Sequence, residues 1–111
     1  MSNNAETDIK ESLTNLRKTK SKLLEIDLEK LNKKEKGDLA DALNTCSLNI
    51  LKLENADLKK LNENFKSKVP KLKCATEIMK KDLDSLTNAV EIIKVASAGL
   101  NIVTEITKLL V

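Results

Sequence analysis

The most apolar segment of the chain is its last 23 residues, Ala89 to Val111, which read AVEIIKVASAGLNIVTEITKLLV. Its charged residues, with one Ala and one Asn between them, recur every three or four positions and so share one narrow stripe of an α-helix. The stripe consists of Glu91, Lys94, Ala98, Asn101, Glu105 and Lys108. Every other position is aliphatic, small or hydroxylated, so this helix needs cover from other helices, a partner protein or lipid.

The composition of the whole chain favours helices over strands. Its 111 residues include 19 Leu, 8 Ile and 5 Val, and Phe65 is the only aromatic residue. Leu, Lys, Glu and Ala are good helix formers, whereas sheets are enriched in aromatic and β-branched residues. This length suits one domain. We expect a flexible leader over residues 1–5 and one helical domain over residues 6–111.

Apolar residues spaced by three and four predict three long helices, over about residues 6–31, 33–67 and 70–110. Asn32 and Glu35 have the spacing of a capping box and start the second helix. Val69 before Pro70 marks the next boundary, because Pro disfavours helix at the preceding residue and suits the first position of a helix.

Two of these helices have an alternative. The first becomes two helices if it bends near Ile26 and Asp27. The second either continues through residues 54–57 with a stutter, which we favour, or breaks near Asn55 and makes four helices.

These elements predict an all-α protein, an elongated up-down antiparallel bundle. A straight helix over residues 70–110 would measure about 61 Å at 1.5 Å per residue. That exceeds the size of a compact domain, so we expect either a long thin bundle or a bend in the last helix at Gly99.

Cys46 and Cys74 each lie on an apolar line, which predicts two buried, reduced thiols. A turn at Val69 and Pro70 places Cys74 opposite residue 64, about 27 Å along the axis from Cys46, and excludes a disulfide. A bridge would require the hairpin to turn within residues 55–62.

No residue set carries recognisable catalytic chemistry. The chain has no His, the commonest general base and zinc ligand. Gly37 and Gly99 are too far apart for a phosphate-binding loop. We therefore expect no enzyme, catalytic residue, metal, cofactor or small-molecule substrate.

The basic residues point weakly to a partner. The net charge is +3, and Arg17 is the only Arg. Nucleic acid is disfavoured, because recognition of bases and phosphates relies on Arg and on aromatic platforms. The densest basic cluster is either a solvated face or a docking patch for an acidic partner or an anionic membrane. It comprises Arg17, Lys18, Lys20 and Lys22.

The N-terminal sequence MSNNAETDIK lacks the pattern of a secretory signal, which predicts a cytoplasmic protein, or a secreted one whose signal has been removed. The sequence has no uncharged apolar window long enough to predict a transmembrane span.

We expect a non-enzymatic protein-binding module, such as an adaptor, a chaperone or a small inhibitor of the immunity type. Its partner would be another protein or a second copy of the chain. The alternative is a membrane-active, lipid-binding protein whose last helix enters a bilayer. The residues expected to form the contact, or else the core beneath it, are Ile92, Val95, Leu100, Val103, Ile106 and Leu110.

Overall fold

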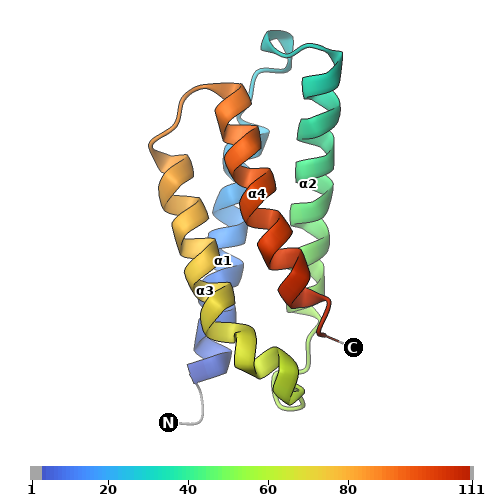
Figure 1. Ribbon diagram of the computed structural model, residues 1–111, viewed down its shortest axis with the longest axis vertical. Helices are drawn as coiled ribbons and strands as arrows, with labels where there is room; N and C mark the ends of the chain where they lie inside the picture. Colours follow the sequence, from blue (N-terminus) through green and yellow to red (C-terminus); the bar gives the residue numbers. More distant parts are fainter. Residues whose placement is uncertain (1–3, 111) are drawn as a thin grey trace.

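Four long α-helices and one turn of 3-10 helix make up the computed structural model, which describes residues 4–110 (Figure 1). They are α1 (Asn4–Leu24), η1 (Leu28–Lys30), α2 (Lys33–Glu54), α3 (Glu63–Asp84) and α4 (Ala89–Thr107). The predicted all-α bundle is confirmed for this part of the chain, with four helices instead of three. Of the predicted leader, residues 1–3 lie outside the described residues, and Ala5 is already helical.

The first helix ends at Leu24, which confirms the alternative break near Ile26 and Asp27, although the second piece is only the 3-10 turn η1. Asp27 then caps η1 by accepting a hydrogen bond from the Glu29 main-chain N–H at 3.0 Å. The predicted capping box of α2 is confirmed. The Asn32 side chain accepts from the Glu35 N–H at 2.8 Å, and the Glu35 carboxylate accepts from the Asn32 N–H at 2.9 Å.

The predicted stutter is wrong, and the alternative break near Asn55 is confirmed. Within the connecting residues 55–62, the Asp57 carboxylate accepts from the Lys59 N–H at 3.0 Å. Asn62 then starts α3 by accepting from the Phe65 N–H at 2.8 Å. Short Asp and Asn side chains offer the main chain these local bonds in place of helical ones, which ends one helix and begins another.

The predicted boundary at Val69 and Pro70 is wrong, because Pro70 lies inside α3. A Pro there removes one main-chain hydrogen bond and bends the helix. Figure 1 shows the first turns of α3, at the bottom of the bundle, bending away from the rest. Phe65, Val69 and Leu72 are all buried, so the turns before and after Pro70 pack into the same core. That burial outweighs the local preference of Pro.

The predicted helix over residues 70–110 divides at residues 85–88. Asn88 caps α4 by accepting from the Glu91 N–H at 3.0 Å. The molecule is 47 Å along its longest axis, which is shorter than an unbroken helix would require. The expected bend at Gly99 is not present either, since α4 continues through it. A Cβ on Gly99 would lie only 2.5 Å from the Met79 sulfur, so this glycine lets α3 and α4 approach closely.

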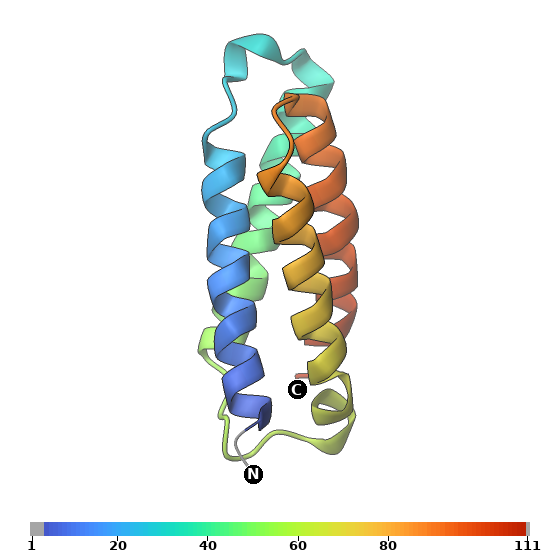
Figure 2. The same ribbon diagram turned by 90° about the vertical axis from the view of Figure 1, so that its left-hand side faces the viewer.

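Consecutive helices alternate in direction, as predicted, but they form two stacked hairpins. α1 packs against α2 and α3, and α4 packs against α3 and α2 (Figures 1 and 2). The neighbours α1 and α3 run parallel, as do α2 and α4. Residues 55–62 cross beneath the bundle, and therefore α2 and α3 lie on a diagonal.

The parallel helices α1 and α3 bury equivalent positions although their sequences differ. Adding 60 to the residue numbers of five buried positions in α1 gives five buried positions in α3. The pairs are Ile9 and Val69, Ser12 and Leu72, Leu16 and Thr76, Thr19 and Met79, and Leu23 and Leu83. This correspondence fits side-by-side stacking of two similar units.

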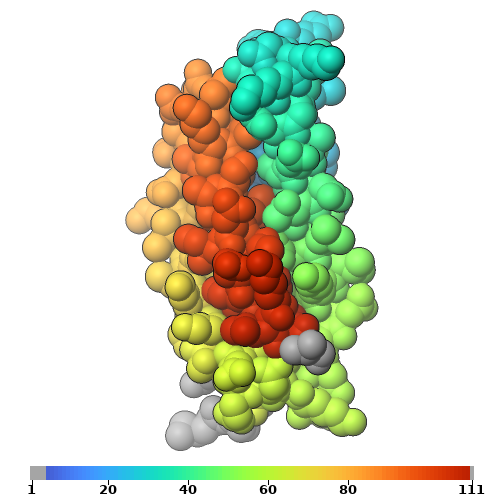
Figure 3. Space-filling model, turned by 45° about the vertical axis from the view of Figure 1, so that its right-hand side comes forward, coloured from blue at the N-terminus to red at the C-terminus, as the bar shows by residue number. Residues whose placement is uncertain are grey.

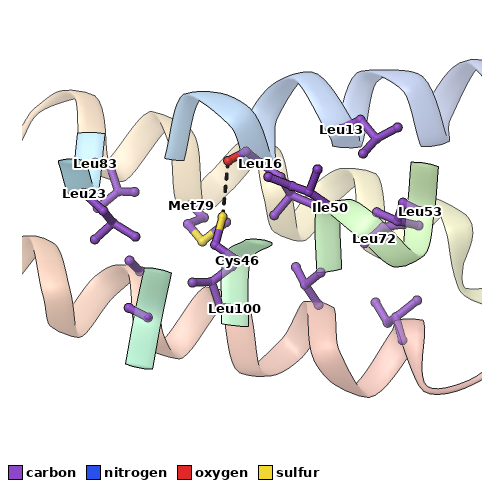
Figure 4. Close-up of a cluster of buried hydrophobic side chains, with 14 of the residues drawn as sticks. Leu13, Leu16, Leu23, Cys46, Ile50, Leu53, Leu72, Met79, Leu83 and Leu100 are labelled. Atoms are coloured by element: carbon purple, nitrogen blue, oxygen red, sulfur yellow. Dashed lines mark hydrogen bonds between the residues drawn. The ribbon is translucent and has the colours of Figure 1, made fainter. Parts of the chain in front are cut away.

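The two cysteines are unbridged, as predicted, but only one is buried. A disulfide would have required the chain to turn within residues 55–62, and the chain does turn there. However, α2 and α3 do not pack against each other, so Cys46 and Cys74 are not brought together. Figure 4 shows Cys46 in the core, donating from its sulfur to the Leu16 carbonyl oxygen at 3.4 Å. Cys74 is exposed on α3, so its predicted burial is wrong.

Candidate functional site

The polar stripe predicted for the last helix is exposed at every position, from Glu91 to Lys108. Most other residues of α4 face the other helices, and Ile102 is the exception that is exposed. Ile92, Leu100, Val103 and Ile106 are buried in the core, while Val95 and Leu110 are half-buried. Four of the six expected contact residues therefore belong to the core, which was the alternative role predicted for them. Two of the six, Ile106 and Leu110, also line hollows at the surface, so a binding surface on the folded protein would combine them with other residues.

The basic cluster of α1 divides into two pairs. Arg17 and Lys20 are three residues apart and Lys18 and Lys22 are four apart, so each pair shares one side of the helix. Arg17 is paired with Glu54 at the end of α2, Lys18 is exposed, and Lys20 and Lys22 are half-buried. Arg17 thus connects α1 to α2 within the first hairpin.

Six large aliphatic side chains are exposed among residues 4–110: Leu24, Leu28, Leu48, Leu51, Ile78 and Ile102. Two of them, Leu51 and Ile102, line hollows at the end of the bundle where α4 finishes. Each is close to half exposed, at 53% for Leu51 and 43% for Ile102.

The first hollow has a volume of about 520 Å³ and lies between α2, the α2–α3 connection and the end of the chain's last helix. Its apolar lining comes from Leu51, Ala56, Leu61 and Leu110. Its polar lining comes from Lys52, Asn55, Asp57, Lys60 and Asn62.

The second hollow is smaller, about 190 Å³, and lies between α3 and α4. Its apolar residues are Ile102, Ile106 and Leu109. Lys68, Lys71 and Glu105 form the rest of its wall.

The two hollows are neighbours, because the consecutive residues Leu109 and Leu110 line one each. Figure 3 shows this face, with the end of α4 standing between α2 and the start of α3. Asn62 connects the elements by donating from Nδ2 to the Leu109 carbonyl oxygen at 2.7 Å while it caps α3. We call the residues lining both hollows the C-terminal surface.

The charges of the C-terminal surface are unbalanced. Lys52, Lys60, Lys68 and Lys71 line it, and within residues 4–110 none of them forms an ion pair. Both carboxylates of the surface are engaged. Glu105 pairs with Lys108 at 2.7 Å, which lowers the pKa of Glu105, and Asp57 accepts from the Lys59 N–H.

A larger hollow, of about 740 Å³, lies between α1 and α3 and differs in its charges. Lys73 lies within 4.0 Å of three carboxylates, those of Asp8, Glu11 and Glu77. The hydrogen bond and charge of Glu11, with the other two carboxylates, raise the pKa of Lys73. Carboxylates of α1 and α3 thus neutralise Lys73, while Lys81, which also lines this groove, forms no ion pair within residues 4–110.

A buried polar cluster between α2 and α4 was missed by the sequence reasoning. Asn49 donates from Nδ2 to the Thr104 hydroxyl at 3.0 Å and accepts from the Thr107 hydroxyl at 2.6 Å. Asn49 and Thr107 are both buried. Because these groups satisfy one another, the cluster sets how α2 and α4 align.

The surface residues Leu51 and Ile102 were also missed. The sequence did contain one indication of their exposure. Each lies outside the line of apolar residues with which its helix packs into the core, and in α2 that line contains Leu43, Cys46, Ile50 and Leu53. The hollows that they line adjoin at one end of the bundle because residues 55–62 cross beneath it. Nothing in the sequence patterns indicates this crossing.

The described helices include none long and apolar enough to cross a membrane. Residues 4–110 also contain no group of three His, Cys, Asp or Glu side chains placed to hold a metal ion. No protein-family model matches the chain, and no curated protein or solved structure matches it.

Proposed function

We propose that this protein is a non-enzymatic binding module that docks onto another protein through its C-terminal surface, as an adaptor, a chaperone or a small inhibitor would. The observation that carries the proposal is the pair of adjacent apolar hollows around the end of α4, each lined by a large, half-exposed aliphatic side chain. Burying the exposed half of such a side chain against a partner contributes about 0.7 to 1.5 kcal/mol. Two neighbouring anchors of this kind fit the central part of a protein interface.

The positions of the anchors support this role. Leu51 and Ile102 come from different hairpins, so the surface exists only in the folded protein. The Asn62 bridge to Leu109 holds the connection and the end of α4 in place, which lowers the entropy lost on binding.

The competing function, insertion of the last helix into a bilayer, requires α4 to leave the bundle. Leu100 and Val103 are buried in the core, so their removal would expose the apolar faces of the other helices to water. The chain also lacks the Trp and Tyr that anchor proteins at membrane interfaces.

The test is capture with a matched pair of variants, from soluble and membrane fractions processed separately. In the surface variant, Leu51→Ser and Ile102→Ser remove the two anchors. In the control variant, Leu24→Ser and Ile78→Ser remove two side chains elsewhere that are at least as exposed, at 63% and 55%. Circular dichroism verifies that both variants fold.

We expect a stoichiometric protein partner that the wild type and the control variant retain. The surface variant should lose it by roughly tenfold or more. Equal retention by both variants would overturn the proposal. So would recovery from the membrane fraction without a protein partner.

A further inference from the structure

We propose that the partner of the C-terminal surface is an acidic amphipathic protein segment. Its apolar side chains enter the two hollows, and its Asp and Glu residues pair with Lys52, Lys60, Lys68 and Lys71. This inference rests on the proposed function and adds the chemistry of the partner.

The first step is the position of the lysines. Lys52 and Lys60 line the hollow that contains Leu51, and Lys68 and Lys71 line the hollow that contains Ile102. Each hollow is therefore lined by two lysines and one acidic residue, Asp57 in the first and Glu105 in the second. A complementary segment therefore carries two apolar residues, one for each hollow, and each of them is flanked by carboxylates.

The second step is that this protein does not neutralise these lysines itself. Within the described residues, none of the four has a carboxylate within 4.0 Å. Of the two acidic residues of the surface, Glu105 pairs with Lys108, and Asp57 accepts from the Lys59 N–H and keeps its charge, so the lysines remain in excess. The groove between α1 and α3 is the contrast, since its Lys73 is surrounded by three carboxylates of the same chain. Charges of opposite sign that face each other across an interface raise the association rate and favour the correct partner over others.

The third step is the choice of carboxylates over phosphates. Recognition of phosphate in nucleic acid favours the Arg fork and aromatic stacking, and no Arg or aromatic residue lines either hollow. Aliphatic walls suit aliphatic side chains between the charges. A protein segment supplies both, whereas a lipid surface presents its charges above its apolar part.

The experiment selects binding peptides from a displayed library of random helical peptides, using the intact protein as bait. Two variants have the same charge change. The surface charge variant carries Lys52→Glu, Lys60→Glu, Lys68→Glu and Lys71→Glu. The control carries Lys18→Glu, Lys33→Glu, Lys36→Glu and Lys81→Glu, four exposed lysines elsewhere that also lack an ion pair within residues 4–110.

We expect the wild type and the control to select peptides with aliphatic residues flanked by Asp and Glu. The surface charge variant should bind these peptides roughly tenfold more weakly or worse, and added salt should weaken the wild-type affinity. Peptides that need Leu51 and Ile102 but show no acidic enrichment would overturn this inference and leave the proposed function standing. Peptides that bind the Leu51→Ser and Ile102→Ser variant unchanged would count against both.

A second probe distinguishes lipid as the source of negative charge. The protein is sedimented with phosphatidylcholine vesicles with and without phosphatidylserine. Binding that needs phosphatidylserine and is lost only in the surface charge variant would overturn the acidic-segment proposal. No sedimentation with either vesicle supports it.

Discussion

Asn62 donates a hydrogen bond from its side-chain Nδ2 to the main-chain carbonyl oxygen of Leu109, 2.7 Å away. The same side chain accepts from the Phe65 N–H, so one amide caps α3 and holds the end of the chain's last helix. It thereby connects two segments that are 47 residues apart in the sequence.

The first prediction concerns this double role. Asn62→Ala should lower the free energy of unfolding by about 1 to 2 kcal/mol, because it removes a helix cap and a second hydrogen bond. Asn64→Ala is the control, since Asn64 is exposed inside α3 and Ala favours helix. Urea denaturation measures both. Equal stability of the two variants would contradict the assigned role of Asn62.

The second prediction concerns the buried cluster of Asn49, Thr104 and Thr107. Asn49→Ala should cost about 1 to 2 kcal/mol, because it removes both hydrogen bonds between α2 and α4 and leaves the two hydroxyl groups only their bonds to the main-chain carbonyls of Leu100 and Thr104. A double-mutant cycle with Thr107→Val should give a coupling energy of roughly 1 kcal/mol. Strict additivity of the two substitutions would show that the 2.6 Å hydrogen bond is not formed in solution.

The two glycines give the third prediction. A Cβ at Gly99 would meet the Met79 sulfur at 2.5 Å, while one at Gly37 has nothing within 4 Å. Gly99→Ala should therefore destabilise the protein despite its better helix propensity. Gly37→Ala should stabilise it by about 0.5 to 1 kcal/mol. Thermal unfolding of both variants makes the comparison, and a stabilising Gly99→Ala would mean that the Met79 side chain moves aside or that α3 and α4 are further apart.

The fourth prediction concerns the thiols. Burial raises the pKa of Cys46 from 9.0 to about 11, and the charge of nearby Lys20 opposes this less strongly. The folded state thus holds the proton more tightly than the unfolded state. The resulting stability, roughly 2 to 3 kcal/mol, is fully present below pH 9 and is lost as the pH rises through about 11.

Two measurements check this prediction. Between pH 9 and pH 11, the free energy of unfolding should fall more for the wild type than for the Cys46→Ala variant. The lysines titrate in both proteins, so the difference between them reports on Cys46 alone. Under native conditions iodoacetamide should modify Cys74 alone, with Cys46 reacting only on unfolding. Two free thiols in unfolded, unreduced protein would confirm that neither is bridged. Equal native reactivity would show that Cys46 is not buried.

Periodicity predicted most buried faces correctly, and it failed where tertiary contacts decide. The seam from Leu39 to Leu53 is buried as its spacing indicates, although Leu43 is only half-buried. Pro70 predicted a boundary that the buried Phe65 and Leu72 override. Asn88 with Glu91 repeats the spacing of Asn32 with Glu35, so the start of α4 was readable from the sequence and was overlooked.

The candidate site was beyond the reach of these patterns. An apolar seam shows that a helix face is covered but not which helix covers it, so the parallel pairing of α1 with α3 has no local signal. Leu51, Leu61 and Leu110 line one hollow from three separate segments. Only the crossing of residues 55–62 brings them together.

The last prediction separates core from surface on α4 itself. Ile106 is 3% exposed and Ile102 is 43% exposed, although they lie one turn apart. Ile106→Asp should unfold the protein or cost about 4 kcal/mol or more, because it buries an unpaired charge. Ile102→Asp should change the unfolding free energy by only about 0.5 kcal/mol. It should nevertheless abolish capture of the partner, because it adds a carboxylate where the acidic segment binds. Urea denaturation and partner capture are measured on the same two variants. A stable Ile106→Asp variant would show that α4 does not pack as described. A folded Ile102→Asp variant that still captures the partner fully would show that the second hollow is not part of the binding surface.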